Sequence, residues 1–188
     1  MDKYNVYQDM SRRTGGEIYL GIVGPVRTGK STFIKRFMEL VVIPEMSDDN
    51  EKVRTIDELP QSADGKTIMT TEPKFIPKEA AVIHFSNQET GKIRLIDCVG
   101  YLVPEAVGAI EEEKERMVKT PWSEEEIPFS KAAEIGTSKV IREHSNLGLI
   151  ITTDGSFGDI AAANFEEALQ KTVMECEKAG KPFLILVN

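Results

Sequence analysis

The chain has 188 residues and a formal net charge of −8, and this length suffices for one well-buried core. The acidic excess argues against nucleic-acid binding, which needs clustered lysine and arginine. No apolar run is long enough to cross a membrane and no secretory signal opens the chain, so we expect a cytoplasmic protein without direct membrane insertion. Cys98, Cys176, His84 and His144 are too scattered to indicate a disulfide framework or a metal cluster.

Apolar runs of strand length alternate with helical patterns along the chain. The expected strands are residues 18–23, 80–85, 93–96, 147–152 and 183–187. The expected helices follow residue 30 and cover residues 130–143 and 164–178; Gly180 and Pro182 mark the last helix stop. This alternation predicts an α/β fold with a mostly parallel sheet flanked by helices.

The first expected strand leads directly into the sequence GPVRTGKS at residues 24–31, which matches the P-loop pattern G-x-x-x-x-G-K-[ST]. Such a loop turns successive N–H groups toward a phosphate at a helix N-terminus. We expect Lys30 to reach the β- and γ-phosphates and the hydroxyl of Ser31 to bind Mg²⁺. The residues expected to contact the nucleotide are Gly24, Pro25, Val26, Arg27, Thr28, Gly29, Lys30, Ser31, Thr32 and, as argued below, Gly100.

Two stretches fit neither a plain strand nor a plain helix. Residues 41–78 are long, polar and rich in proline, and they lie where Ras-like GTPases carry their first switch loop. Residues 101–129 contain the charge run 111–116, which we interpret as a solvated helical face. Trp122, the only tryptophan, is interpreted as a local anchor for this stretch rather than as a binding hot spot.

A second motif follows the strand at residues 93–96. Asp97 and Gly100 form D-x-x-G, which places a carboxylate at the carboxyl end of a strand beside the P-loop. Asp97 is therefore the expected magnesium-binding acid, acting through water. The backbone N–H of Gly100 could contact the γ-phosphate.

Between these motifs lie Thr67, Thr70 and Thr71. A switch threonine can bind Mg²⁺ through its hydroxyl and the γ-phosphate through its backbone. Threonines in an exposed loop would give the same spacing, so the residues alone leave both interpretations open.

Several blocks together resemble the stage IV sporulation protein A family of endospore-forming bacteria. They are the P-loop with its following helix and residues 57–62, 67–75, 97–101, 120–122, 132–137, 143–145 and 152–155. The resemblance implies an ATPase related to the translation-factor-like GTPases (TRAFAC class), with residues 17–188 as the P-loop domain and 1–16 as an extension. It implies nucleotide binding by Lys30, metal coordination by Asp97 and a sensor role for Thr70 and Thr71. Our expected catalytic set is Lys30, Thr70, Thr71 and Asp97.

The same resemblance implies a biological setting. Slow ATP hydrolysis, with Mg²⁺, would drive self-assembly of the basement layer of the spore coat in the mother-cell cytoplasm, at the forespore surface. The implied partners are further copies of the protein, a small amphipathic membrane-anchoring peptide and other coat morphogenetic proteins. Family members also carry middle and C-terminal domains, so we expect this domain to be truncated. Two alternatives stay open: a regulatory GTPase, and a structural module that binds nucleotide without turnover.

Two features bear on mechanism. Ras-like GTPases place a water-orienting Gln after D-x-x-G, whereas this chain has Tyr101, so hydrolysis needs another group. Thr70 or Thr71 is the first candidate, and Arg27 is an alternative charge stabiliser. The base-selecting motif [N/T]-K-x-D would begin at Asn188, so the preference for ATP rests on the family resemblance.

Overall fold

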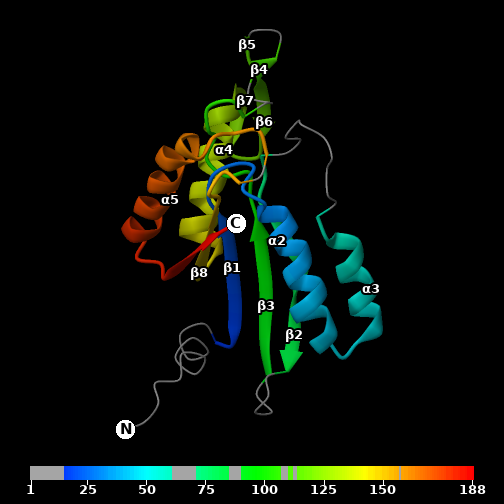
Figure 1. Ribbon diagram of the computed structural model, residues 1–188. Coiled ribbons are helices and arrows are strands. Elements are labelled where there is room, and N and C mark those ends of the chain that lie inside the picture. Colours follow the sequence, from blue (N-terminus) through cyan, green and yellow to red (C-terminus); the bar gives the residue numbers. More distant parts are fainter. Residues whose placement is uncertain (1–14, 61–70, 85–89, 107–109, 112–113, 157) are drawn as a thin grey trace.

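A five-stranded sheet forms the centre of the computed structural model, which describes residues 15–60, 71–84, 90–106, 110–111, 114–156 and 158–188 (Figure 1). The strand order is β2-β3-β1-β8-β9. The bounds are β1 Glu17–Val23, β2 Lys74–His84, β3 Thr90–Asp97, β8 Leu147–Thr152 and β9 Phe183–Val187. β3, β1, β8 and β9 run parallel, and β2 pairs antiparallel with β3 at one edge. The predicted mostly parallel sheet is confirmed.

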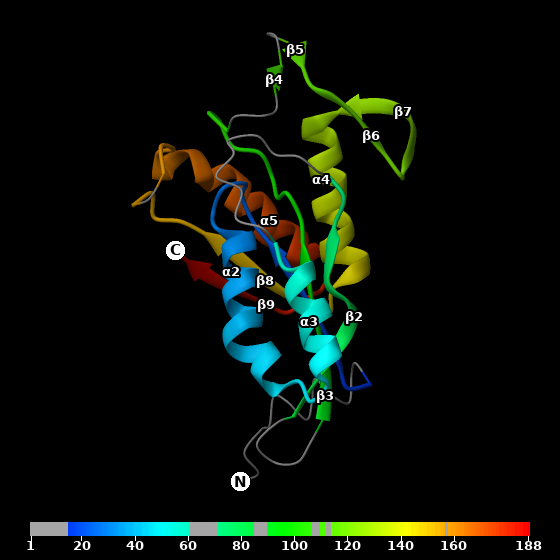
Figure 2. The same ribbon diagram turned by 90° about the vertical axis from the view of Figure 1, so that its right-hand side faces the viewer.

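Helices cover both faces of the sheet (Figures 1 and 2). α2 (Lys30–Phe37) and α3 (Asp49–Glu58) lie on one face, and α4 (Phe129–Lys139) and α5 (Glu166–Lys178) lie on the other. Alternating side chains of β1 supply both cores: Ile22 packs toward α2 with Ile34, and Val23 packs toward α4 and α5 with Ile150. None of the helices in the described part of the chain could span a bilayer.

Short turns continue or precede the main helices. π-helical turns continue α2 and α4 as η1 (Met38–Val42) and η3 (Val140–His144), and 3-10 turns form η2 (Ile43–Glu45) and η4 (Ala162–Phe165). α5 is followed by Gly180 with φ +62, as the predicted helix stop requires. β9 is an edge strand whose Leu184 and Val187 side chains are 64% and 66% exposed.

The prediction that residues 41–78 form one long loop is wrong where η1, η2, α3 and β2 form. α3 begins after Asp48, whose carboxylate accepts hydrogen bonds from the backbone N–H of Asn50 (2.7 Å) and Glu51 (3.1 Å). The sequence of this helix lacks a clear apolar stripe, because Thr55 is its only buried residue. β2 extends from Lys74 to His84 and includes Pro77. Proline is tolerated there because it lies at a register irregularity of an edge strand.

The helical interpretation of the charge run 111–116 is also wrong. β4 (Ile110–Glu111) and β5 (Lys114–Glu115) form one hairpin, and β6 (Met117–Thr120) and β7 (Ser123–Pro128) form a second. The register pairs Glu111 with Lys114, so the described part of the charge run is strand and not helix. Both hairpins lie at the end of the domain toward which the parallel strands run (Figure 1).

Candidate nucleotide-binding site

The P-loop joins the carboxyl end of β1 to the N-terminus of α2 and depends on left-handed backbone conformations. Gly24 and Gly29 have φ +126 and +90, and the exposed Arg27 has φ +62. A Cβ at Gly24 would lie 2.4 Å from the backbone oxygen of Ile151, so only glycine fits there. Gly29 is the N-cap of α2, which places the loop at a positive helix end.

Internal contacts hold the loop in shape. The Thr28 hydroxyl donates to the Pro25 carbonyl at 3.0 Å. Lys30 is buried, with 5% of the residue exposed. Its ammonium donates to the Pro25 carbonyl at 2.5 Å and to the Gly24 carbonyl at 3.5 Å. The lysine is thus bent over the loop, with its charged end inside the concavity.

Asp97 lies at the end of β3, beside Ile22 of β1 in the sheet register. The Ser31 hydroxyl donates to Oδ2 of Asp97 at 2.8 Å. Oδ1 of Asp97 is buried and has no hydrogen-bond partner among the described residues. A buried carboxylate oxygen without a partner, next to a hydroxyl, fits a hard cation such as Mg²⁺.

This donor set suits a cation that is shared with a phosphate. The described residues contain no group of three or more His, Cys, Asp or Glu able to hold a metal. Mg²⁺ in nucleotide sites commonly takes one or two protein ligands and completes its shell with phosphate oxygens and water. Ser31 and Asp97 therefore fit a nucleotide-dependent magnesium site better than an independent metal site.

Burial controls the electrostatics of the site. Burial lowers the pKa of Lys30, although the nearby Cys98 and Asp97 oppose the shift. Burial raises the pKa of Asp97, while the Ser31 hydrogen bond and Lys30 oppose it. Burial likewise raises the pKa of the Cys98 thiol to about 11, so Cys98 is an inert neutral thiol in this core.

The D-x-x-G segment is joined to the P-loop. The Val26 N–H donates to the Tyr101 carbonyl at 2.9 Å, and Pro25 and Tyr101 form a parallel bridge. Gly100 has φ +91, and a Cβ there would lie 2.1 Å from the Gly24 oxygen and 2.7 Å from Nζ of Lys30. The close packing of Gly100 on the P-loop requires glycine.

Tyr101 is a core residue in this structure. Its side chain is buried with Val26, Val103, Phe165 and Ala168, and the Lys171 ammonium lies 4.8 Å from the ring centroid. Burial is the main cause that raises the pKa of its hydroxyl. The ring thus anchors the segment against α5, which is a structural use of the position that carries Gln in Ras-like GTPases.

The structure brings the P-loop residues, Ser31, Asp97 and Gly100 together. Thr32 is exposed in the first turn of α2. Thr71 is buried with its backbone oxygen against Gly136 of α4, whereas Thr67 and Thr70 lie outside the described residues. The placement of Thr71 depends on α4, which the motifs do not indicate.

Asn188 also reaches the P-loop, which sequence reasoning missed. Its Nδ2 donates to the Thr28 carbonyl at 3.3 Å and would lie 2.7 Å from a Cβ at Gly29. Its backbone N–H donates to the Thr152 carbonyl at 2.9 Å. The available signal was an Asn at the end of a parallel strand, near the expected base-selecting motif.

Comparisons with known proteins agree with the geometry. The family model for the stage IV sporulation protein A ATPase domain matches residues 1–188. Similar curated proteins, each called stage IV sporulation protein A, come from Bacillus subtilis strain 168 (57% identical), Bacillus anthracis (55%) and Clostridioides difficile strain 630 (50%). The matches cover 98–100% of this chain and 38% of each relative's length. The chain belongs to the stage IV sporulation protein A family and corresponds to its ATPase domain.

Proposed function

We propose that this chain binds and hydrolyses ATP, and that turnover drives self-assembly of the basement layer of the spore coat. The observation that carries the proposal is the Ser31–Asp97 pair, with Oδ1 of Asp97 unpartnered among the described residues and the Lys30 ammonium nearby. Membership of the ATPase-domain family supports the same activity. The parallel sheet with its P-loop between β1 and α2 supports a fold of the translation-factor-like (TRAFAC) type, with residues 17–188 as the domain and 1–16 as an extension.

The proposed roles follow from the site. The backbone of residues 24–29, with Lys30 and Thr32, binds the phosphates, and the N–H of Gly100 contacts the γ-phosphate. Ser31 and Asp97 hold Mg²⁺, which neutralises phosphate charge when it is bound. Thr70 and Thr71 orient the γ-phosphate and the attacking water, because Tyr101 is packed in the core. Arg27 is exposed on the loop and is retained as a secondary charge stabiliser.

The biological setting is proposed from the family. The partners are further copies of the protein, a small amphipathic membrane-anchoring peptide and other coat morphogenetic proteins, and the place is the mother-cell cytoplasm at the forespore surface. These roles belong to the longer protein, because the chain spans 38% of its relatives' length. For the 188-residue chain we expect weakened nucleotide binding and little polymerisation.

A hydrolysis panel tests the proposal. Phosphate release from ATP and from GTP is measured with the 188-residue chain and with a chain of its relatives' length, with Lys30→Ala as the control for contaminating activity, and light scattering on the same samples reports assembly. We expect slow, Mg²⁺-dependent release from ATP that the Lys30→Ala variant lacks. Preferential release from GTP would favour a regulatory GTPase. Tight binding without release from either nucleotide would leave a structural module.

A further inference from the structure

A glycine lies in the middle of α4 where another segment meets the helix. A Cβ at Gly136 would lie 2.7 Å from the backbone oxygen of Thr71, 3.8 Å from Cη2 of Trp122 and 3.9 Å from Cδ of Pro73. Glycine inside a helix is less favourable than alanine. Here the missing side chain leaves room for the Thr71 carbonyl. We call Gly136, with the facing Thr71 carbonyl and Trp122 ring, the α4 notch.

The next residue of α4 lies beside the D-x-x-G segment. Thr137 is fully buried beside the thiol of Cys98, the residue after Asp97. Its hydroxyl donates to the Ala133 carbonyl at 2.8 Å. Lys74, close after Thr71, pairs with Asp97 across β2 and β3. One turn of α4 therefore supports both the Thr71 segment and the segment from Asp97 to Gly100.

The β6–β7 hairpin contributes Trp122 to the notch. Trp122 lies in its turn, and the indole N–H is buried without a hydrogen-bond partner among the described residues. The base of the hairpin is fixed to the start of α4, since the Phe129 N–H donates to the Arg116 carbonyl at 2.8 Å and the Arg116 guanidinium lies 5.0 Å from the Phe129 ring centroid. The hairpin is thus attached at its base, and Trp122 lies against the notch through packing.

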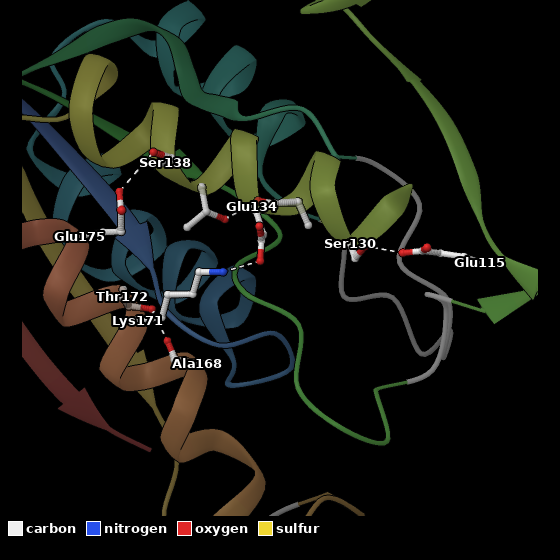
Figure 3. A network of polar contacts seen from close by, with 10 residues as sticks. Glu115, Ser130, Glu134, Ser138, Ala168, Lys171, Thr172 and Glu175 are labelled. Carbon is white, nitrogen blue, oxygen red and sulfur yellow. Dashed lines mark hydrogen bonds and ion pairs between the residues drawn. The ribbon is translucent and has the colours of Figure 1, made fainter. Parts of the chain in front are cut away.

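Polar contacts fix α4 on its opposite side (Figure 3). Ser138 donates to Glu175 of α5 at 3.2 Å, and Lys171 of α5 pairs with Glu134. Ser130 donates to Glu115 at the base of the hairpins at 2.5 Å. α4 is therefore held between α5 and the hairpins, so a change at the notch displaces the Thr71 segment more easily than the helix.

We propose that Gly136 and Trp122 are positioning residues for ATP hydrolysis: the α4 notch holds the Thr71 segment so that Thr71 faces the nucleotide. The inference rests on the proposed function. Trp122, the only tryptophan in the chain, then reports on this segment when nucleotide binds. If the notch served only to fold α4, filling it would affect stability and leave the reaction unchanged.

The test is steady-state ATP hydrolysis by Gly136→Ala, Trp122→Ala and Trp122→Phe, with Ser138→Ala as the matched control on the α5-facing side of α4. We expect Gly136→Ala and Trp122→Ala to lower kcat about tenfold or more, with KM changed less than about threefold, because misplacement affects the chemical step. Trp122→Phe, which keeps a ring, restores most of kcat, and Ser138→Ala matches the unaltered chain. Circular dichroism and thermal unfolding identify variants that fail to fold.

Fluorescence supplies a second readout. Emission of Trp122 in the 188-residue chain is titrated with a non-hydrolysable ATP analogue and with ADP, each with Mg²⁺, while calorimetry measures binding. We expect a spectral shift with the ATP analogue that exceeds the shift with ADP. An unaltered kcat in folded Gly136→Ala, or constant emission despite measured binding, overturns the positioning role and leaves the proposed function standing. If the unaltered protein neither binds nor hydrolyses ATP, the proposed function fails and this inference fails with it.

Discussion

The P-loop and the Thr71 segment are held in place by different means. The P-loop is fixed by its own glycines and by short internal contacts from Thr28 and Lys30. The Thr71 segment packs on Gly136, with Trp122 beside the same glycine, and both residues come from elements much later in the chain. Under the proposed function, phosphate binding therefore depends on local contacts, whereas the arrangement for hydrolysis depends on tertiary packing.

The largest effect is expected from removing the charged groups of the P-loop region. Lys30→Ala and Asp97→Asn should each lower single-turnover ATP hydrolysis by about a hundredfold or more, because both remove electrostatic stabilisation of the phosphates. Rapid-quench measurements at saturating ATP would check this. Rates within about threefold of the unaltered protein would show that neither group acts in the reaction.

Gly100→Ala tests how closely the D-x-x-G segment must approach the P-loop. The new Cβ would lie 2.1 Å from the Gly24 oxygen, so one of the two segments has to move. We expect ATP affinity to fall about tenfold and the melting temperature to fall. Gly158→Ala is the matched control, because it has φ +81 and nothing within 4 Å, and so measures backbone strain alone. Equal effects of the two variants would contradict the steric argument.

Tyr101→Gln tests whether the Ras-like residue could act at this position. Because the ring is 4% exposed and packed under Lys171, we expect a loss of about 2 kcal/mol in the free energy of unfolding and no gain in hydrolysis rate. Urea denaturation and the hydrolysis assay measure the two outcomes, with Tyr101→Phe as the ring-preserving control. Faster hydrolysis in the glutamine variant would show that the position faces the nucleotide after all.

The smallest effect concerns the contact between η3 and α5. Arg142 of η3 donates to Glu175 at 3.1 Å, and this hydrogen bond is the main cause that lowers the pKa of Glu175 below its ordinary 4.5. Arg142→Met should therefore lower the free energy of unfolding slightly at pH 7. Because the folded-state pKa is lowered, the contribution is complete above pH 4.5 and disappears as the pH falls through the folded-state value. Urea denaturation at pH 7 and pH 3 measures it, and a pH-independent loss would assign the effect to packing.

The sequence predicted those features whose causes are local. The P-loop, the central strands and the stop of α5 at Gly180 depend on neighbouring residues, and the structure contains them. α3 was missed because it buries only Thr55, and the charge run 111–116 could satisfy a helix face or a hairpin equally. The contact of Thr71 with Gly136 joins residues far apart in sequence, so no local spacing could indicate it.

The exposed edge strand β9 affects how any assembly experiment should be interpreted. Its consecutive apolar side chains, Leu184 to Val187, are 40–66% exposed, and among the described residues it pairs only with β8. An exposed apolar edge can add strands from other molecules without any nucleotide. Light scattering by this chain therefore reflects coat-like polymerisation only if it depends on ATP and disappears in Lys30→Ala. Scattering that a charged substitution such as Ile185→Lys removes in the absence of ATP would be edge-to-edge aggregation.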